Sequence, residues 1–257
     1  MDRNGRRKTG CLDQGRFLNS CETGDLEGVK AALERGVDVN IKFKNKFSKL
    51  SNKTGLMWAL LSNQNHIVEF LLSTPNIDVN CKNWEFETAM HFAVIGDNHE
   101  GLAMLLARPE VDVNQKNKFG RTPWMLAVQN FCVDCLNLLL ADPRVEPNER
   151  GPRGMITWHP TWRFGEGNYD SSQPPLPTLS LAVMRGDVPL VKFLLESPRI
   201  DPNTKDGTYW SKTPLMYAVK ENKEIMVKIL LADPRVDLFT TENFDMKDED
   251  LTRYIMS

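Results

Sequence analysis

The sequence repeats itself, and the spacing of that repeat limits the possible folds more than any other feature. Alanines recur in five similar segments at spacings of 34, 34, 55 and 36 residues. Each alanine stands 21 residues before the residue that closes its segment. A period of roughly 20–50 residues is typical of arrays of small stacked units. The alanines are Ala59, Ala93, Ala127, Ala182 and Ala218.

Each repeated segment predicts two short helices followed by a loop. Thr122-Pro123 is a typical helix start, because a threonine hydroxyl can accept hydrogen bonds from unpaired amides and proline fits the first helical position. A proline follows each second helix and stops it. One unit buries too little apolar surface to offset the entropy of ordering its backbone, so we expect the units to stack. The segments are 54–80, 87–114, 121–148, 177–203 and 213–239, with a shorter copy at 17–40.

The pattern resembles the ankyrin repeat over residues 17–240. The features that carry the resemblance are the Thr-Pro-Leu-like helix start, the alanine, a Gly-Asp-like break, a Val-x-x-Leu-Leu run and a closing Asp-Val-Asn or Asp-Pro-Asn. It implies an all-α ankyrin-repeat solenoid of about six helix-turn-helix repeats. By this resemblance, β-hairpin fingers and first helices would line a concave face. Pro177-Thr178 departs from the pattern, as does one extra residue after each second helix of the five longer units.

The rest of the chain is assigned around the repeats. Residues 1–15 are basic and predict a disordered tail, residues 16–240 form the repeat domain, and residues 241–257 predict a short capping segment. Residues 149–176 are an insertion dense in glycine and proline that also contains Trp158 and Trp162. We expect an ordered excursion that contributes to the concave site, and a disordered loop is the alternative.

Several classes of function find no support in the sequence. The Cys132-Val133-Asp134-Cys135 run occupies core positions in the register and has no second ligand pair, which favours packing over a zinc or redox site. No catalytic motif is present, so we expect no enzyme, metal or cofactor. Five scattered cysteines and no apolar leader or membrane-spanning run predict an intracellular chain without membrane insertion, in the cytoplasm or the nucleus.

The finger segments are the candidate binding residues. Aromatic side chains stand beside lysines and arginines on several fingers, a combination suited to acidic peptides through cation–π and charge-assisted contacts. The alternative is that the rings pack finger against finger and the lysines are simply solvated. The candidates are Lys44, Lys46, Trp84, Phe86, Phe119, Arg121, Tyr209 and Trp210, followed by Trp158 and Trp162 in the insertion.

These observations favour a non-catalytic protein–protein interaction module or scaffold that acts as a monomer and binds protein partners through acidic segments. A net charge of −2 argues against a general nucleic-acid binder. The alternative is a receptor for a small phosphorylated or nucleotide ligand, held by Trp84, Phe119 and Lys118. The resemblance also implies that Asn80, Asn114 and Asn148 are targets of an asparaginyl hydroxylase, because each has a leucine eight residues upstream. A purely structural role for these asparagines is the other possibility.

Overall fold

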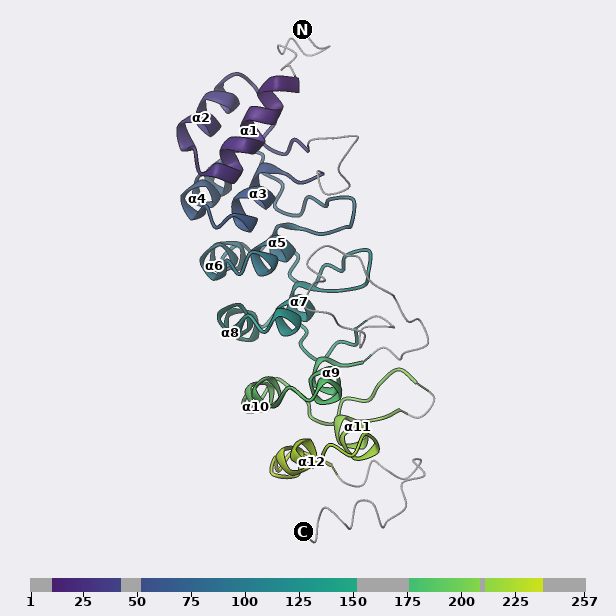
Figure 1. The fold of residues 1–257 in the computed structure, drawn as a ribbon. Helices are drawn as coiled ribbons and strands as arrows, with labels where there is room; N and C mark the ends of the chain where they lie inside the picture. The colour runs from purple at the N-terminus through teal and green to yellow at the C-terminus, as the bar shows by residue number, and fades with distance from the viewer. Residues whose placement is uncertain (1–10, 43–51, 152–175, 209–210, 238–257) are drawn as a thin grey trace. The chain divides into compact units, whose positions relative to one another are not determined.

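The computed structural model describes residues 11–42, 52–151, 176–208 and 211–237, which contain twelve α-helices (Figure 1). Contacts divide the chain into two compact units, residues 1–145 and 146–257. Unit 1 contains α1 (Cys11–Thr23), α2 (Leu26–Glu34), α3 (Gly55–Leu61), α4 (Asn65–Ser73), α5 (Ala89–Ile95), α6 (His99–Leu106), α7 (Pro123–Asn130) and α8 (Val133–Ala141). Unit 2 contains α9 (Thr178–Arg185), α10 (Val188–Glu196), α11 (Pro214–Lys220) and α12 (Glu224–Leu231).

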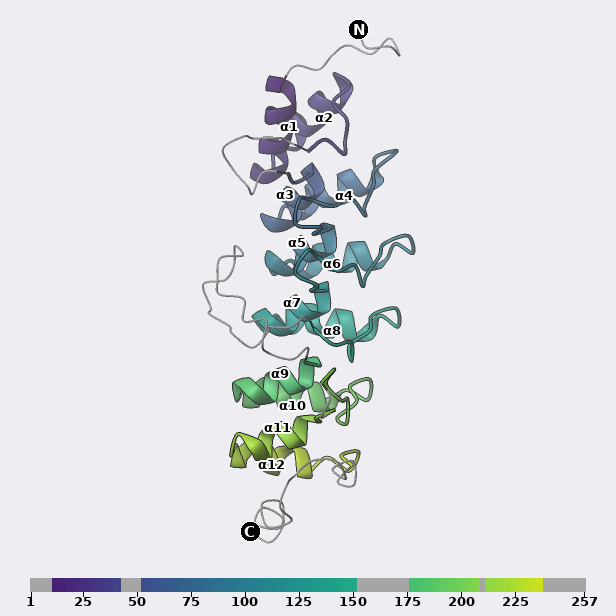
Figure 2. The same ribbon diagram turned by 90° about the vertical axis from the view of Figure 1, so that its right-hand side faces the viewer.

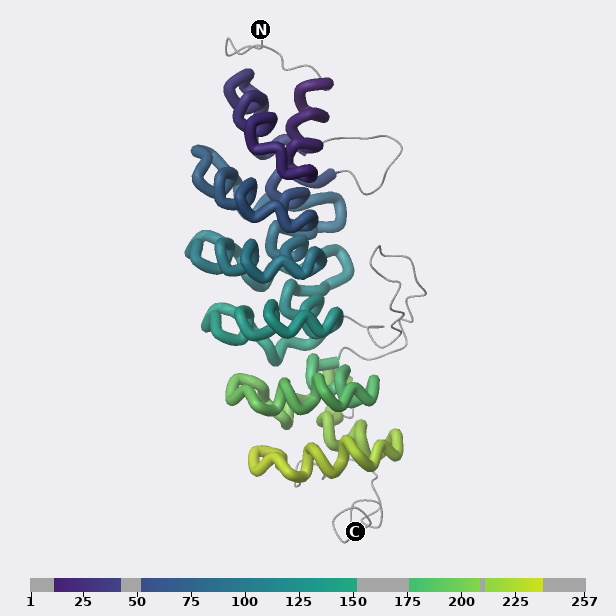
Figure 3. Tube along the Cα trace, turned by 60° about the vertical axis from the view of Figure 1, so that its left-hand side comes forward, coloured from purple at the N-terminus to yellow at the C-terminus, as the bar shows by residue number. Residues whose placement is uncertain are grey.

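The helices pair as the repeat predicts. In unit 1 the first helices α1, α3, α5 and α7 pack on one another in order, and the second helices α4, α6 and α8 form a parallel layer (Figures 1 and 2). In unit 2, α9 packs on α11 and α10 packs on α12 (Figure 3). The repeat alanines are fully buried in these first helices, where a small side chain lets the neighbouring helix approach. The predicted helix-turn-helix repeats are therefore confirmed.

The helix starts at Thr122 and Thr213 follow the predicted chemistry, whereas α9 begins differently. The hydroxyls of Thr122 and Thr213 accept hydrogen bonds from the amides three residues later, at 3.3 and 3.4 Å. At α9 the N-cap is Pro177, which has no side-chain cap. Thr178 instead donates its hydroxyl hydrogen to the carbonyl oxygen of Pro147 at 2.9 Å. The inverted Pro-Thr pair therefore ties the helix start to the preceding loop.

The fingers are tight loops in the part of the chain that the structure describes. Backbone hydrogen bonds join the two sides of the second finger (residues 81–87), the third finger (115–121) and the last finger (204–212). The amides of Asn83, Asn117 and Asp206 donate to the carbonyl oxygens of Glu87, Arg121 and Lys212, respectively. Among the described residues the one β-bridge, Arg150–Pro177, is isolated, and no strand forms. The predicted hairpins are hairpin-like turns there, without a ladder.

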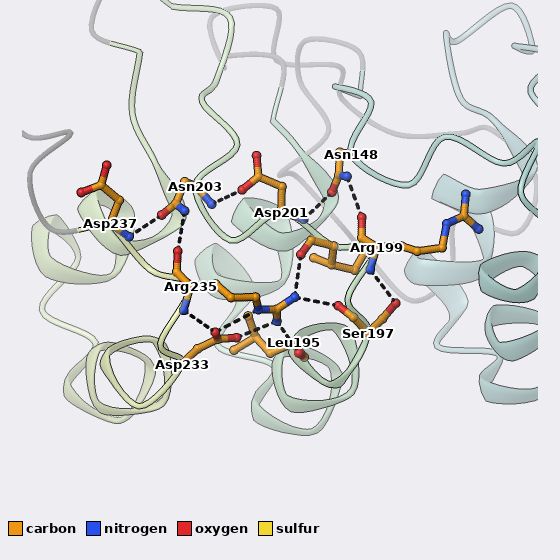
Figure 4. A network of polar contacts seen from close by, with 10 residues as sticks. Asn148, Leu195, Ser197, Arg199, Asp201, Asn203, Asp233, Arg235 and Asp237 are labelled. Atoms are coloured by element: carbon orange, nitrogen blue, oxygen red, sulfur yellow. Dashed lines mark hydrogen bonds and ion pairs between the residues drawn. The ribbon is translucent and has the colours of Figure 1, made fainter.

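The closing asparagines connect each repeat to the next. Asn203 donates its amide hydrogen to the carbonyl oxygen of Arg235 at 2.7 Å and accepts from the amide of Asp237 at 2.7 Å (Figure 4). Asn148 makes the same pair of bonds to Arg199 and Asp201, at 2.8 and 2.9 Å. These side chains satisfy backbone groups of the following loop that would otherwise need water.

Arginines in the loops after the second helices cap the helices of the preceding repeat. Arg108 donates to the carbonyl oxygen of Leu72 in α4, and Arg144 donates to that of Leu106 in α6, both at 2.7 Å. Arg235 reaches the carbonyl oxygen of Leu195 in α10 and is held there by Asp233 (Figure 4). A guanidinium group at a helix C-terminus satisfies free carbonyls and complements the helix dipole.

The chain termini add little to the described structure. Helix α1 begins at Cys11, inside the segment 1–15, and residues 1–10 and 238–257 lie outside the described residues, including the expected capping segment. None of the described helices has the length and apolar character required to cross a bilayer.

Candidate functional site

Asparagine side chains fix the shape of the second and third fingers. The Oδ1 atom of Asn83 accepts hydrogen bonds from the amides of Glu85 and Glu87, both at 2.8 Å. Asn117 does the same with Phe119 and Arg121 at 3.0 Å. Because each side chain bridges its own loop, the finger tips are held in one conformation before any partner arrives.

The second and third fingers are also joined to each other. The Nζ atom of Lys118 lies 2.5 Å from Oε1 of Glu85, and the amide of Lys118 donates to the carbonyl oxygen of Glu85 at 2.7 Å. On the other side, Lys42 of the first finger (residues 41–53) donates to the carbonyl oxygen of Lys82 at 2.8 Å. The described residues of these three fingers, 41–42, 81–87 and 115–121, are therefore linked to one another, and we call them the finger face.

Aromatic rings on the finger face divide into two kinds. Trp84 is 57% exposed and Phe86 is 54% exposed, so neither ring is packed between fingers. Phe119 is half-buried, with Nζ of Lys118 at 4.8 Å and Cζ of Arg121 at 5.6 Å from its ring centroid. The packing alternative therefore applies in part to Phe119, whereas Trp84 and Phe86 face solvent.

Lys53 of the first finger is buried rather than solvated. Its side chain is 6% exposed, and its Nζ atom lies 4.4 Å from the ring centroid of Trp58 and 5.3 Å from that of Phe92. Burial lowers the pKa of Lys53, and nearby glutamates, with Glu87 the largest, partly offset that effect. Lys53 fastens the end of the first finger to α3 and α5 through cation–π contacts.

His91 connects the start of α5 to the third finger. Its Nδ1 atom accepts the amide hydrogen of Thr88 at 3.1 Å, so the ring hydrogen is on Nε2, which donates to the carbonyl oxygen of Arg121 at 3.1 Å. Burial lowers the pKa of His91 from 6.5 to about 4. The ring of His91 is therefore neutral in the folded chain at neutral pH.

This arrangement predicts a pH-dependent stability. The contribution of neutral His91 is complete above pH 6.5 and is lost as the pH falls toward 4, because the unfolded chain takes up the proton first. At about 1.4 kcal/mol per pKa unit, wild type should lose about 3 kcal/mol more than His91→Met over this range. Methionine is the matched replacement because Met57, Met125 and Met216 fill the same helix position. Urea unfolding followed by circular dichroism measures the difference, and parallel pH profiles would contradict it.

The cysteine pair that the sequence singled out lies in the core. Cys132 and Cys135 are buried, and burial raises the pKa of Cys135 to about 12, so its thiol stays protonated. The described residues contain no cluster of metal-binding side chains. The packing interpretation of this cysteine pair therefore agrees with its position in the core.

The predicted modification sites are half-buried and engaged. Asn80 donates to the carbonyl oxygen of Glu110 at 2.7 Å and accepts from the amide of Asp112 at 2.9 Å. Asn114 donates to Arg144 at 2.6 Å, and Asn148 makes the bonds given above. Hydroxylation of these residues stays a prediction. A mass increase of one oxygen atom on intact protein from animal cells is the test.

The other candidates lie outside the described residues. These are Lys44 and Lys46 of the first finger, Trp158 and Trp162 of the insertion, and Tyr209 and Trp210 of the last finger. They stay predictions. Sequence reasoning missed Glu85 and the loop-closing Asn83 and Asn117, although the recurrence of asparagine at the start of both fingers was a usable signal.

A family model of ankyrin repeats matches residues 56–150 and 177–250. Among solved structures, the ankyrin repeat domain of Bcl-3, described as a member of the IkappaB protein family, is similar with a TM-score of 0.66 and 19% identity over 86% of each chain. A structure of a predatory endopeptidase from Bdellovibrio bacteriovorus in complex with an immunity protein has a TM-score of 0.60 and 23% identity, covering 84% of this chain and 97% of that chain. At these identities the structures show the fold alone.

Curated relatives match a shorter part of the chain. Palmitoyltransferase AKR1 from Lachancea kluyveri is 35% identical over 74 residues, and the one from Naumovozyma castellii is 37% identical over 74 residues. The match covers 28% of this chain but only 10% and 9% of those proteins. The chain thus corresponds to about a tenth of their length.

Proposed function

We propose that this chain, which belongs to the ankyrin-repeat family, is a non-catalytic module that binds protein partners through its finger face. The observation that carries the proposal is the exposed ring of Trp84 on a finger whose backbone is already fixed by Asn83. Large rings that stay solvated in a folded chain are typical of interface hot spots. A finger that does not need to be ordered on binding loses less affinity to entropy.

The charge of the finger face indicates what kind of segment it binds. The finger face contains five lysines and arginines but only two acidic residues, Glu85 and Glu87. Such a surface attracts acidic segments over a distance of about 8 Å at physiological salt. We therefore propose acidic peptide segments of a protein as the partner.

A nucleotide receptor fits this surface less well. That function needs Lys118 as the ligand of a phosphate group, but Lys118 forms an ion pair with Glu85. A phosphate at this position would have to displace the carboxylate or lie beside it, and both arrangements cost electrostatic energy. An acidic peptide does not depend on Lys118, because its carboxylates can reach Lys42, Lys82 or Lys116 instead. The curated palmitoyltransferases share only the short segment described above, so their activity is not proposed for this chain.

Selection of a random peptide library, displayed on phage, against the full chain tests the proposal. We expect enrichment of peptides rich in aspartate and glutamate, with affinities that fall as salt rises and fall about tenfold or more in Trp84→Ala. Ile225→Ala is the matched control, because Ile225 is 64% exposed but lies on α12 of unit 2, away from these fingers in sequence. Thermal stabilisation by ATP or an oligonucleotide, without any enriched peptide, would instead support the nucleotide receptor.

A further inference from the structure

Phe86 occupies a backbone conformation that suits glycine. Its φ angle is +59°, in the left-handed region, where a bulky side chain is strained. In the third finger the equivalent position is Gly120, with φ of +73°. The two positions are equivalent, because each stands three residues after the asparagine that closes its finger. The amides of Phe86 and Gly120 donate to the carbonyl oxygens of these asparagines, at 3.1 and 2.8 Å.

The strain at Phe86 is not offset by burial of its ring. More than half of the side chain is exposed, and the neighbouring Trp84 is exposed to the same degree. A residue that costs stability without filling the core indicates a role outside the folding of the chain. The second finger thus exposes two large rings to solvent, and one of them, Phe86, occupies the position at which the third finger has glycine.

The surroundings of this ring pair restrict the partner. Basic residues of the finger face flank it on both sides: Lys42 and Lys82 on one side, joined by a hydrogen bond, and Lys116 and Arg121 of the third finger on the other. A second copy of this chain is disfavoured, because a symmetric contact would place the same cationic surface against itself. Nucleic acid is disfavoured because it carries a phosphate at every nucleotide, so a base at the ring pair would bring phosphates close to the carboxylates of Glu85 and Glu87. A peptide can keep its acidic residues away from these two carboxylates.

We propose that Trp84 and Phe86 form an apolar anchor that takes a large apolar side chain of a partner peptide, with aspartates or glutamates on either side of that side chain reaching the lysines of the finger face. The proposal rests on the function proposed above and adds that the finger face recognises a large apolar residue of the partner peptide. Strain at Phe86 serves to project its ring into this contact.

Variants at Phe86 separate a binding role from a folding role. Phe86→Gly and Phe86→Asn both remove the ring yet suit the left-handed backbone, which this chain already adopts at Asn63 and Asn76. We expect their thermal midpoints to equal or exceed that of wild type. Phe86→Tyr keeps a ring and should keep binding.

The probe is the same phage-displayed peptide library, followed by anisotropy of labelled peptides that it enriches on wild type. We expect those peptides to carry a leucine, methionine or aromatic residue between acidic residues, and to bind Phe86→Gly and Phe86→Asn about tenfold more weakly or worse. A lower thermal midpoint in both variants would show that Phe86 supports the fold and would overturn the anchor.

The outcomes distinguish the two proposals. If acidic peptides are enriched but bind Phe86→Gly as tightly as wild type, or lack an apolar residue, the anchor is wrong and the acidic-segment module stands. If no peptide is enriched, both fail. If wild type forms a dimer in sedimentation and Phe86→Gly does not, the occupant is a second copy of the chain. If an oligonucleotide binds wild type but not Phe86→Gly, the occupant is nucleic acid. Either result overturns the peptide anchor.

Discussion

Replacement of Trp124 by alanine is expected to destabilise the chain more than any other single change considered for unit 1. Trp124 lies in α7 and its side chain is fully buried. Removing a buried tryptophan ring leaves a cavity that the surrounding helices fill only partly, which costs about 3–5 kcal/mol. Urea unfolding monitored by circular dichroism measures the loss.

Trp84→Ala is the matched control for this variant. It removes the same side chain from an exposed position, so the free energy of unfolding should change by less than about 0.5 kcal/mol. The two variants together separate the roles of tryptophan in this chain: Trp124 supports the fold, and Trp84 is available to a partner. Equal losses in the two variants would contradict this division.

At neutral pH, Arg144→Met is expected to have the second largest effect on stability. The guanidinium group donates to the carbonyl oxygens of Leu106 and Arg108 at 2.7 and 3.0 Å and pairs with the largely buried carboxylate of Asp142. Methionine keeps much of the side-chain volume but leaves these acceptors without their donor, which costs about 2–3 kcal/mol. The decrease in urea midpoint is the measurement.

Arg16→Met provides the control for Arg144→Met, because Arg16 lies exposed on α1. A change within about 0.5 kcal/mol is expected there. Arg144→Lys should recover only part of the loss, since an ammonium group cannot donate to several acceptors in the planar arrangement that arginine uses. Full recovery by lysine would show that charge alone, rather than the forked hydrogen bonds, explains the effect.

The fold could be predicted from sequence because its signals are local and recur. The repeat alanine and the capping threonines act within one turn of their own helix, so their spacing alone specifies the helix pairs. The arginine caps could not be found in this way. Arg144 donates to the carbonyl oxygen of Leu106, which lies 38 positions earlier in the sequence. The sequence pattern shows only that the loop after the second helix is one residue longer than expected, and this does not indicate a helix cap.

The finger face was predicted in part. Trp84 and Phe86 were named as candidates, but the conformational strain at Phe86 emerges only when its register with Gly120 is known together with the φ angles. The burial of Lys53 could not be predicted, because its neighbours Trp58 and Phe92 come from two different repeats. Side-chain burial of this kind depends on tertiary packing, which composition and spacing do not reveal.

The arginine caps give unit 1 a direction. Each cap is supplied by the repeat that follows in sequence: the loop after α6 serves α4, and the loop after α8 serves α6. Shortening unit 1 from its C-terminal side would therefore leave the newly terminal second helix with bare carbonyls, whereas removing α1 and α2 would take none of these caps away. Tolerance to deletion should be unequal at the two ends, even though the repeats themselves look interchangeable.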